Sequence, residues 1–195
     1  MSEPLVWITG FGAFEDVDDN PSGRLAERLS GAPPAGIRVR AEVLPASFRR
    51  APEAWDRVLG GAEAERPRLV LALGVHKEPG FRLERRARGR LPEAERTDVD
   101  GVTAAAATAR AEGVRVTPLD LDALVRDWEG RLEEGIFVSE DAGGYVCERL
   151  YHHVLARAEG LGVAGLFLHV PPLRFTALER QAEVVAGLLG DLVGR

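Results

Sequence analysis

Apolar, β-rich runs alternate with amphipathic stretches along this chain, and that alternation constrains the fold more than any other feature. The clearest run is RLVLALGV, which follows Pro67, contains Gly74 near its end and is typical of a strand buried on both faces. Further strands are expected at 5–14, 36–47, 81–89, 114–120, 135–141 and 165–173, and helices at 21–30, 48–61, 121–132, 143–160 and 175–194. This order predicts an α/β fold with a largely parallel sheet and helices on both faces.

Length and composition narrow the function classes. The chain has 195 residues and 45% hydrophobic side chains, which predicts one domain spanning 1–195 with a sizeable core. Its formal net charge of −6 argues against nucleic acid as a partner, because neutralising phosphates requires a basic face. No apolar run is long enough to cross a bilayer, and no signal peptide is expected. A single cysteine cannot form an internal disulfide, so the cytoplasm is the expected location.

The N-terminal segment ITGFGAF invites a nucleotide-binding interpretation, because a Gly-x-Gly follows a strand. The third glycine of a dinucleotide fingerprint is missing, since Phe14 and Glu15 occupy that neighbourhood, and the chain has no Gly-Lys-Ser/Thr. The segment is then either a simple strand-to-helix turn or a loop that presents Phe11 and Phe14 to an apolar ligand. Asn20 is the expected cap of the following helix.

Three strand exits carry candidate chemistry. Cys147 is expected in the first turn of a helix behind Gly143 and Gly144, where free N–H groups and the helix dipole favour a thiolate and could hold an oxyanion. His169, near the carboxyl end of a strand, could accept the thiol proton, and Glu84 could orient the imidazole.

Each of these residues also has a simpler interpretation. Cys147 could be a small core residue, and His169 a satisfied core histidine. Glu84 could pair with Arg82 or Arg86. The remaining histidines, which have no zinc-ligand spacing, are expected to be structural or exposed. They are His76, His152 and His153.

Five segments resemble the pyroglutamyl peptidases of type I, which are cysteine peptidases that remove an N-terminal pyroglutamyl residue. ITGFGAFEDVDDNPS is similar to the family's opening segment, VLPASFRRA to its second strand and turn, and LALGVHKEPGFRLERRA to the segment with its catalytic glutamate. VSEDAGGYVCERLYHHVL is similar to its nucleophile motif, and FLHVPPL to its His-Val-Pro motif. The last two motifs, in this order and spacing, are specific.

The resemblance implies an α/β/α sandwich and a catalytic triad of Cys147, His169 and Glu84. It also implies that Phe11 and Phe14 line a pocket for the pyrrolidone ring, that Asn20 helps to hold that region, and that the protein assembles as a tetramer or dimer. Glu148 departs from the family, which usually has asparagine after the cysteine. A carboxylate there could disfavour a thiolate. The segment after Glu84 also differs from the family pattern.

The sequence therefore predicts a cysteine exopeptidase that acts on peptides with an N-terminal pyroglutamate and needs no metal or organic cofactor. Backbone N–H groups near Gly144 and Cys147 are expected to bind the oxyanion. A neutral lactam pocket should reject residues with a free α-amino group, although Glu15 and Asp16 lie close enough in sequence to weaken that expectation. The alternatives are a related amidohydrolase with altered acyl specificity and a non-catalytic protein that binds a small ligand.

Overall fold

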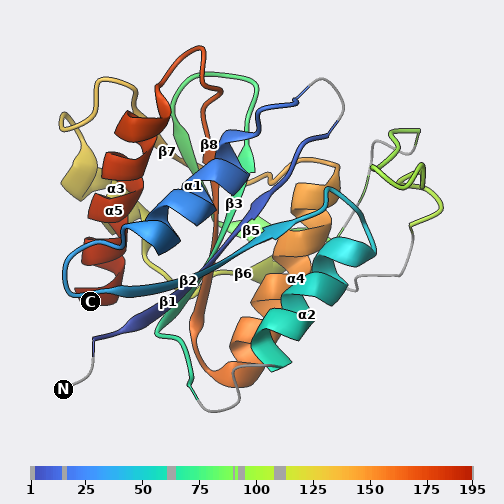
Figure 1. Cartoon of the computed structure of the whole chain (residues 1–195), viewed down its shortest axis with the longest axis horizontal. Coiled ribbons are helices and arrows are strands. Elements are labelled where there is room, and N and C mark those ends of the chain that lie inside the picture. The colour runs from blue at the N-terminus through green and yellow to red at the C-terminus, as the bar shows by residue number, and fades with distance from the viewer. Residues whose placement is uncertain are drawn as a thin grey trace.

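The computed structural model describes residues 3–14, 17–60, 65–89, 91, 95–107 and 113–194. Within them, six strands form a central sheet in the order β2-β1-β3-β8-β4-β7 (Figure 1). These strands are β1 (Leu5–Phe11), β2 (Arg38–Leu44), β3 (Leu69–Val75), β4 (Phe81–Glu84), β7 (Ile136–Ser139) and β8 (Ala164–Val170). The helices are α1 (Pro21–Gly31), α2 (Arg50–Gly60), α3 (Leu121–Trp128), α4 (Val146–Leu161) and α5 (Leu178–Gly194). The alternating order predicted from the sequence is confirmed.

The sheet is mostly parallel, as predicted, but its direction changes at β4. Strands β2, β1, β3 and β8 run parallel to one another, whereas β4 pairs antiparallel with β8 and parallel with β7. The segment 81–89, predicted as one strand, is divided in two. After β4, the short β5 (Arg86–Ala87) leaves the sheet and pairs with β6 (Arg115–Val116). The insertion of β4 beside β8 is what brings Glu84 into the interior.

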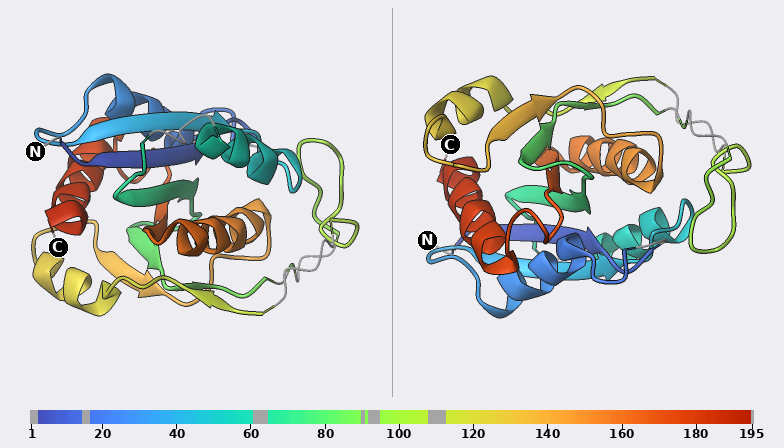
Figure 2. Two further views of the ribbon diagram at one scale, coloured as in Figure 1. Left: turned by 90° about the horizontal axis from the view of Figure 1, so that it is seen from below. Right: turned by 90° about the horizontal axis from the view of Figure 1, so that it is seen from above.

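Two apolar clusters cover the two faces of the sheet, and the side chains of β3 contribute to both. Leu69, Leu71 and Leu73 pack with side chains of α1, α3 and α5. Val70 and Ala72 pack on the opposite face with side chains of α2 and α4. Figure 2 shows these helices on both sides of the sheet. The expected strand buried on both faces is therefore confirmed, and the layers are α/β/α.

The turn after β1 matches the interpretation as a strand-to-helix connection. A Cβ on Gly10 would lie 2.0 Å from the backbone oxygen of Ser22, so the glycine lets α1 pack directly against β1. Asn20 caps α1 by accepting a hydrogen bond from the Ser22 N–H at 3.1 Å. Its side-chain amide also donates to the Gly12 carbonyl at 2.9 Å, which ties the loop to the helix.

In its described part the segment 89–113 is a loop, which fits the excursion loop predicted for 89–101, whereas the strand or helix predicted for 102–113 is absent from the described residues of that range. Residues 95–107 contain turns and one isolated bridge between Thr97 and Thr103. Figure 1 shows this segment projecting beyond α2 and α4. The remainder of the excursion, and also Glu15 and Asp16, lie outside the described residues. Among the helices that are described, none combines the length and apolarity needed to cross a membrane.

Candidate active site

His169 and Glu84 meet because of the register between β4 and β8. His169 lies opposite Arg82, and Glu84 lies two residues further along β4 on the same face of the sheet. From this diagonal position the Nδ1 of His169 lies 2.7 Å from Oε1 of Glu84. Both side chains are buried, with 5% and 1% of their surface exposed. The Tyr151 hydroxyl donates to the Glu84 carbonyl at 2.7 Å, which holds the end of β4 in place.

Cys147 approaches His169 from α4, where it is the second helical residue. Gly74 on β3 pairs with His169 on β8 and leaves room for the sulfur. A Cβ added to Gly74 would lie 3.1 Å from Sγ of Cys147 and 2.8 Å from the ring of Phe167. The glycine is therefore required here for close approach, and the sequence pattern of β3 did not indicate that role.

The imidazole of His169 is held in its charged form by its two neighbours. Burial, the largest single effect, lowers its pKa, but side-chain interactions with Cys147 and Glu84 together raise that pKa from 6.5 to about 9. The charged form of His169 is therefore favoured between the sulfur and the carboxylate. This arrangement activates a cysteine as a nucleophile and supplies a proton for a leaving group.

The start of α4 offers backbone N–H donors beside the sulfur. The N-cap residue, Tyr145, makes no side-chain capping hydrogen bond, so the first-turn N–H groups are not satisfied by a cap. Gly143 adopts a φ of +88°, a left-handed conformation that favours glycine. Its N–H donates to the Asp141 side chain at 3.0 Å. The loop is thereby shaped so that the helix start faces the sulfur.

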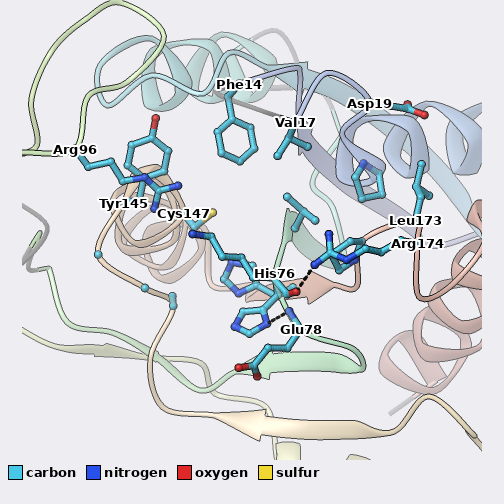
Figure 3. A pocket seen from close by; sticks show the side chains of 18 of the residues that line it. Phe14, Val17, Asp19, His76, Glu78, Arg96, Tyr145, Cys147, Leu173 and Arg174 are labelled. Carbon is cyan, nitrogen blue, oxygen red and sulfur yellow. Dashed lines mark hydrogen bonds between the residues drawn. The ribbon is translucent and has the colours of Figure 1, made fainter.

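A cavity of about 780 Å³ opens above Cys147 and His169 (Figure 3). It lies at the carboxyl ends of β1, β3 and β8, where parallel sheets usually form their sites. Phe14 and Tyr145 form an aromatic wall, with ring centroids 6.0 Å apart. Besides Phe14, Tyr145, Cys147 and His169, the cavity is lined by Val17, Asp18, Asp19, Pro21, Val75, His76, Lys77, Glu78, Arg96, Asp141, Ala142, Gly143, Gly144, Pro172, Leu173 and Arg174.

The candidate residues occupy different places relative to this cavity. Phe14 lines it and Gly144 borders it beside Cys147. Phe11 is buried in the apolar cluster beneath, with 3% of its surface exposed, and is not among the lining residues. Asn20 is also buried below the surface, in its capping role. The structure thus brings Phe14 to the sulfur, whereas Phe11 and Asn20 support the loop from behind.

Several lining residues were not identified from the sequence, among them Tyr145, Arg96 and His76. Tyr145 directly precedes α4, packs edge-on against Phe48 and donates its hydroxyl to the Thr97 carbonyl at 2.8 Å. The guanidinium of Arg96 lies 3.8 Å from the centroid of the Tyr145 ring, and no local pattern indicates that contact. His76 was expected to be structural or exposed, but it lines the cavity. Its position directly after β3 was the available signal.

His76 is a neutral neighbour of His169, with ring centroids 5.8 Å apart. Burial lowers the pKa of His76 to about 4, and the charges of Arg82 and His169 act in the same direction. Its Nδ1 accepts hydrogen bonds from the backbone N–H of Glu78 and from Nε of Arg82, both at 3.2 Å. The proton of the neutral ring is therefore on Nε2.

Glu148 follows Cys147 but its carboxylate points elsewhere. Only 1% of its surface is exposed, and Oε1 accepts a hydrogen bond from the Gly89 N–H at 2.7 Å. Burial raises the pKa of Glu148 to about 7, although backbone donors at Gly89 and Arg88 oppose that rise. The expected conflict with a thiolate is thus reduced, because the group binds the segment after β5 and is about half protonated at neutral pH.

Within the described part of the chain, no group of three or more His, Cys, Asp or Glu side chains is placed to bind a metal ion. An imidazole between a cysteine sulfur and a buried carboxylate, with free N–H donors beside the sulfur, defines an α/β protein of the cysteine hydrolase class.

Comparison with known proteins specifies the class further. The family model for pyroglutamyl peptidase matches residues 5–186. A pyrrolidone-carboxylate peptidase of Cupriavidus taiwanensis is 32% identical over 180 residues, which cover 87% of this chain and 79% of that protein. A second from Chromobacterium violaceum is also 32% identical over 180 residues, covering 85% and 77%. The chain therefore belongs to the pyroglutamyl peptidase family.

Solved structures agree with this assignment. The pyrrolidone carboxyl peptidase of Fervidobacterium islandicum superposes with a TM-score of 0.83 at 26% identity, covering 97% of this chain and 98% of that one. Pyroglutamyl peptidase I of Bacillus amyloliquefaciens superposes with a TM-score of 0.84 at 20% identity, covering 99% and 98%. The family fold implied by the sequence motifs is confirmed over nearly the whole chain.

Proposed function

We propose that this protein hydrolyses the bond after an N-terminal pyroglutamyl residue, with Cys147, His169 and Glu84 as its catalytic residues. The observation that carries the proposal is the placement of the thiol beside a charged, carboxylate-bound imidazole on the floor of an aromatic-walled cavity. Membership of the family supports the substrate class, and the geometry supports the roles of the three residues.

The chemical steps follow from these positions. His169 accepts the proton of the Cys147 thiol, the sulfur attacks the acyl carbonyl, and the first-turn N–H groups of α4, with Gly144 nearby, bind the oxyanion. His169 donates its proton to the leaving amine, which departs and leaves a thioester on the sulfur. Water then attacks the thioester and gives up a proton to His169. Pyroglutamate is released, and the sulfur and imidazole return to their starting state.

The aromatic wall suits a flat, neutral lactam. Phe14 and Tyr145 offer apolar surface to the ring, while Phe11 and Asn20 hold the Phe14 loop from below. A residue with an open chain would bring a charged α-amino group to the same surface. Moving an ammonium from water onto an aromatic surface is costly, so we expect glutamyl and glutaminyl groups to be rejected; Asp18 is the lining carboxylate that could weaken this expectation.

The experiment compares kcat/KM for pyroglutamyl, prolyl and glutaminyl amides that share one fluorogenic leaving group. We expect turnover of the pyroglutamyl amide only, because proline lacks the lactam oxygen and glutamine carries the ammonium. Equal turnover of the glutaminyl amide would refute the lactam pocket and favour an amidohydrolase of altered acyl specificity. Binding of pyroglutamate without turnover of any amide would instead favour a non-catalytic role.

Three further parts of the proposal concern the state of the protein. We place residues 1–195 in one catalytic domain, supported by the family match over most of the chain. We propose a tetramer or dimer, supported by exposed apolar side chains such as Phe137, Val114 and Val116. We propose a cytoplasmic location, since the single cysteine is free. Light scattering tests the assembly, and cell fractionation tests the location.

A further inference from the structure

Beyond the aromatic wall, the charged groups that line the cavity are unevenly paired. Three of its carboxylates each form an ion pair with an arginine. The pairs are Asp19 with Arg24, Glu78 with Arg82, and Asp141 with Arg88. By contrast, among the residues that the structure describes, Lys77 and Arg174 form no ion pair. Two exposed cations at this part of the cavity are therefore left without a carboxylate.

The same two residues are held next to each other. Lys77 follows β3 and Arg174 follows β8, and these strands are parallel neighbours whose carboxyl ends meet at the cavity. The guanidinium of Arg174 donates to the backbone carbonyl of Lys77 at 2.8 Å, a contact that is visible in Figure 3. Two cations without a carboxylate partner in one part of the cavity make the local potential positive, which favours an anion there.

The proposed reaction defines which part of the substrate lies near Lys77 and Arg174. His169 must lie beside the leaving amine, because it donates the proton. The neighbour of His169 in the cavity is His76, at 5.8 Å between ring centroids, and Lys77 comes next in the chain. Phe14 and Tyr145 line the other side of the sulfur (Figure 3). The residue after pyroglutamate therefore extends toward Lys77 and Arg174.

We propose that Lys77 and Arg174 form a subsite for a carboxylate carried by the residue that follows pyroglutamate. The carboxylate is either the chain end of a pyroglutamyl dipeptide or the side chain of aspartate or glutamate, since both present the same group. Asp18 is the remaining carboxylate of the described lining, and it adjoins Val17 on the Phe14 loop. The inference rests on the proposed function, because the leaving-group side is defined by that reaction.

The test measures ratios of kcat/KM, which cancel changes in the chemical step. One arm compares pyroglutamyl-alanine with its C-terminal amide, and the other compares the amides of pyroglutamyl-glutamate and pyroglutamyl-glutamine. We expect the carboxylate member to be preferred about fivefold in at least one arm, as for exposed charge pairs. The preference should fall to about 1 in the double variant Lys77→Gln, Arg174→Gln, and should shrink as ionic strength rises from about 0.05 to 0.5 M.

Arg28→Gln is the matched control, because Arg28 is an exposed arginine on α1 that does not line the cavity. It removes one positive charge, half of what the double variant removes, and should leave both ratios unchanged. A ratio near 1 in both arms of the wild type, with the neutral amides still hydrolysed, would overturn the subsite and leave the proposed function standing. An equal loss in Arg28→Gln would also overturn it, by assigning the preference to net charge. Failure to hydrolyse any pyroglutamyl substrate would overturn both proposals.

Discussion

Two buried glutamates lie near Cys147, and their carboxylates meet different partners. Glu84 and Glu148 are each 1% exposed, and each has one oxygen without a partner among the described residues. Oε1 of Glu84 faces an imidazole that can carry charge, whereas Oε1 of Glu148 faces the backbone N–H of Gly89. The first partner can compensate a negative charge in full, and the second only in part.

In the proposed mechanism, that difference gives Glu84 a catalytic role and Glu148 a structural one. Glu84 helps to raise the pKa of His169 to about 9, so its charge acts on the reacting groups. Burial raises the pKa of Glu148 to about 7, so the folded state disfavours the charged form of this carboxyl group. The same side chain, equally buried, therefore stabilises an ion pair in one place and behaves as a weak acid in the other.

The largest effect is expected at the sulfur that lies near both glutamates. Cys147→Ala should lower kcat/KM for a pyroglutamyl amide by at least about 1,000-fold, since no other thiol is present to replace the nucleophile. The pKa of His169 should also fall, because Cys147 is one of the groups that raise it. Enzyme kinetics and NMR titration of the imidazole measure the two effects. Activity within about tenfold of wild type, ~1.4 kcal/mol in barrier, would end the proposed mechanism.

A matched pair of variants tests the difference between Glu84 and Glu148 most directly. Glu84→Gln should lower kcat on the order of 100-fold, because the imidazolium loses its carboxylate. Glu148→Gln should leave kcat within about threefold, because its amide oxygen can still accept from the Gly89 N–H. Steady-state kinetics from pH 5 to about 9 would report both. Equal losses in the two variants would mean that burial, and not the partner, decides the role of each glutamate.

Much of this arrangement could be predicted from local sequence patterns. Cys147 was expected in the first turn of a helix and His169 near the end of a strand, and the structure has both there. These positions depend on periodicity and on glycines close in sequence, which act over a few residues. Asn20 was expected to cap α1 for the same reason, and it does so.

The depth of Glu84 could not be predicted in this way. In the sequence it alternates with arginines, which is typical of a strand with one solvated face. The structure instead places β4 inside the sheet, between β8 and β7, and Glu84 is buried. Strand order depends on contacts far apart in sequence, as do the direction of Glu148 and the contact of Arg96 with Tyr145.

A smaller effect is expected from moving the sulfur without changing either glutamate. Gly74→Ala would place a methyl group 3.1 Å from Sγ of Cys147 and 2.8 Å from the Phe167 ring, so both must shift. We expect kcat to fall about tenfold and stability to fall by about 1–3 kcal/mol through overpacking. Kinetics and urea unfolding measure the two losses. Gly160→Ala is the control, since a Cβ there meets nothing within 4 Å; if Gly74→Ala behaved like it, close packing at the sulfur would be disproved.

The smallest effect on activity, and the sharpest test of the comparison, is the pH dependence of stability in Glu148→Gln. An unfolded glutamate has a pKa of 4.5, whereas folding raises that of Glu148 to about 7. The folded state then holds the proton more tightly, so the contribution of Glu148 is most favourable below about pH 4.5 and declines as pH rises through 7. Glutamine has no proton to lose, so the variant should gain about 2 kcal/mol relative to wild type between pH 5 and 8. Urea unfolding of both proteins across that range measures the difference.

Glu53→Gln, which changes an exposed carboxylate on α2, should show no such trend. A pH-independent difference for Glu148→Gln would mean that Glu148 is ionised as readily as any surface glutamate, and the contrast with Glu84 would then lose its physical basis.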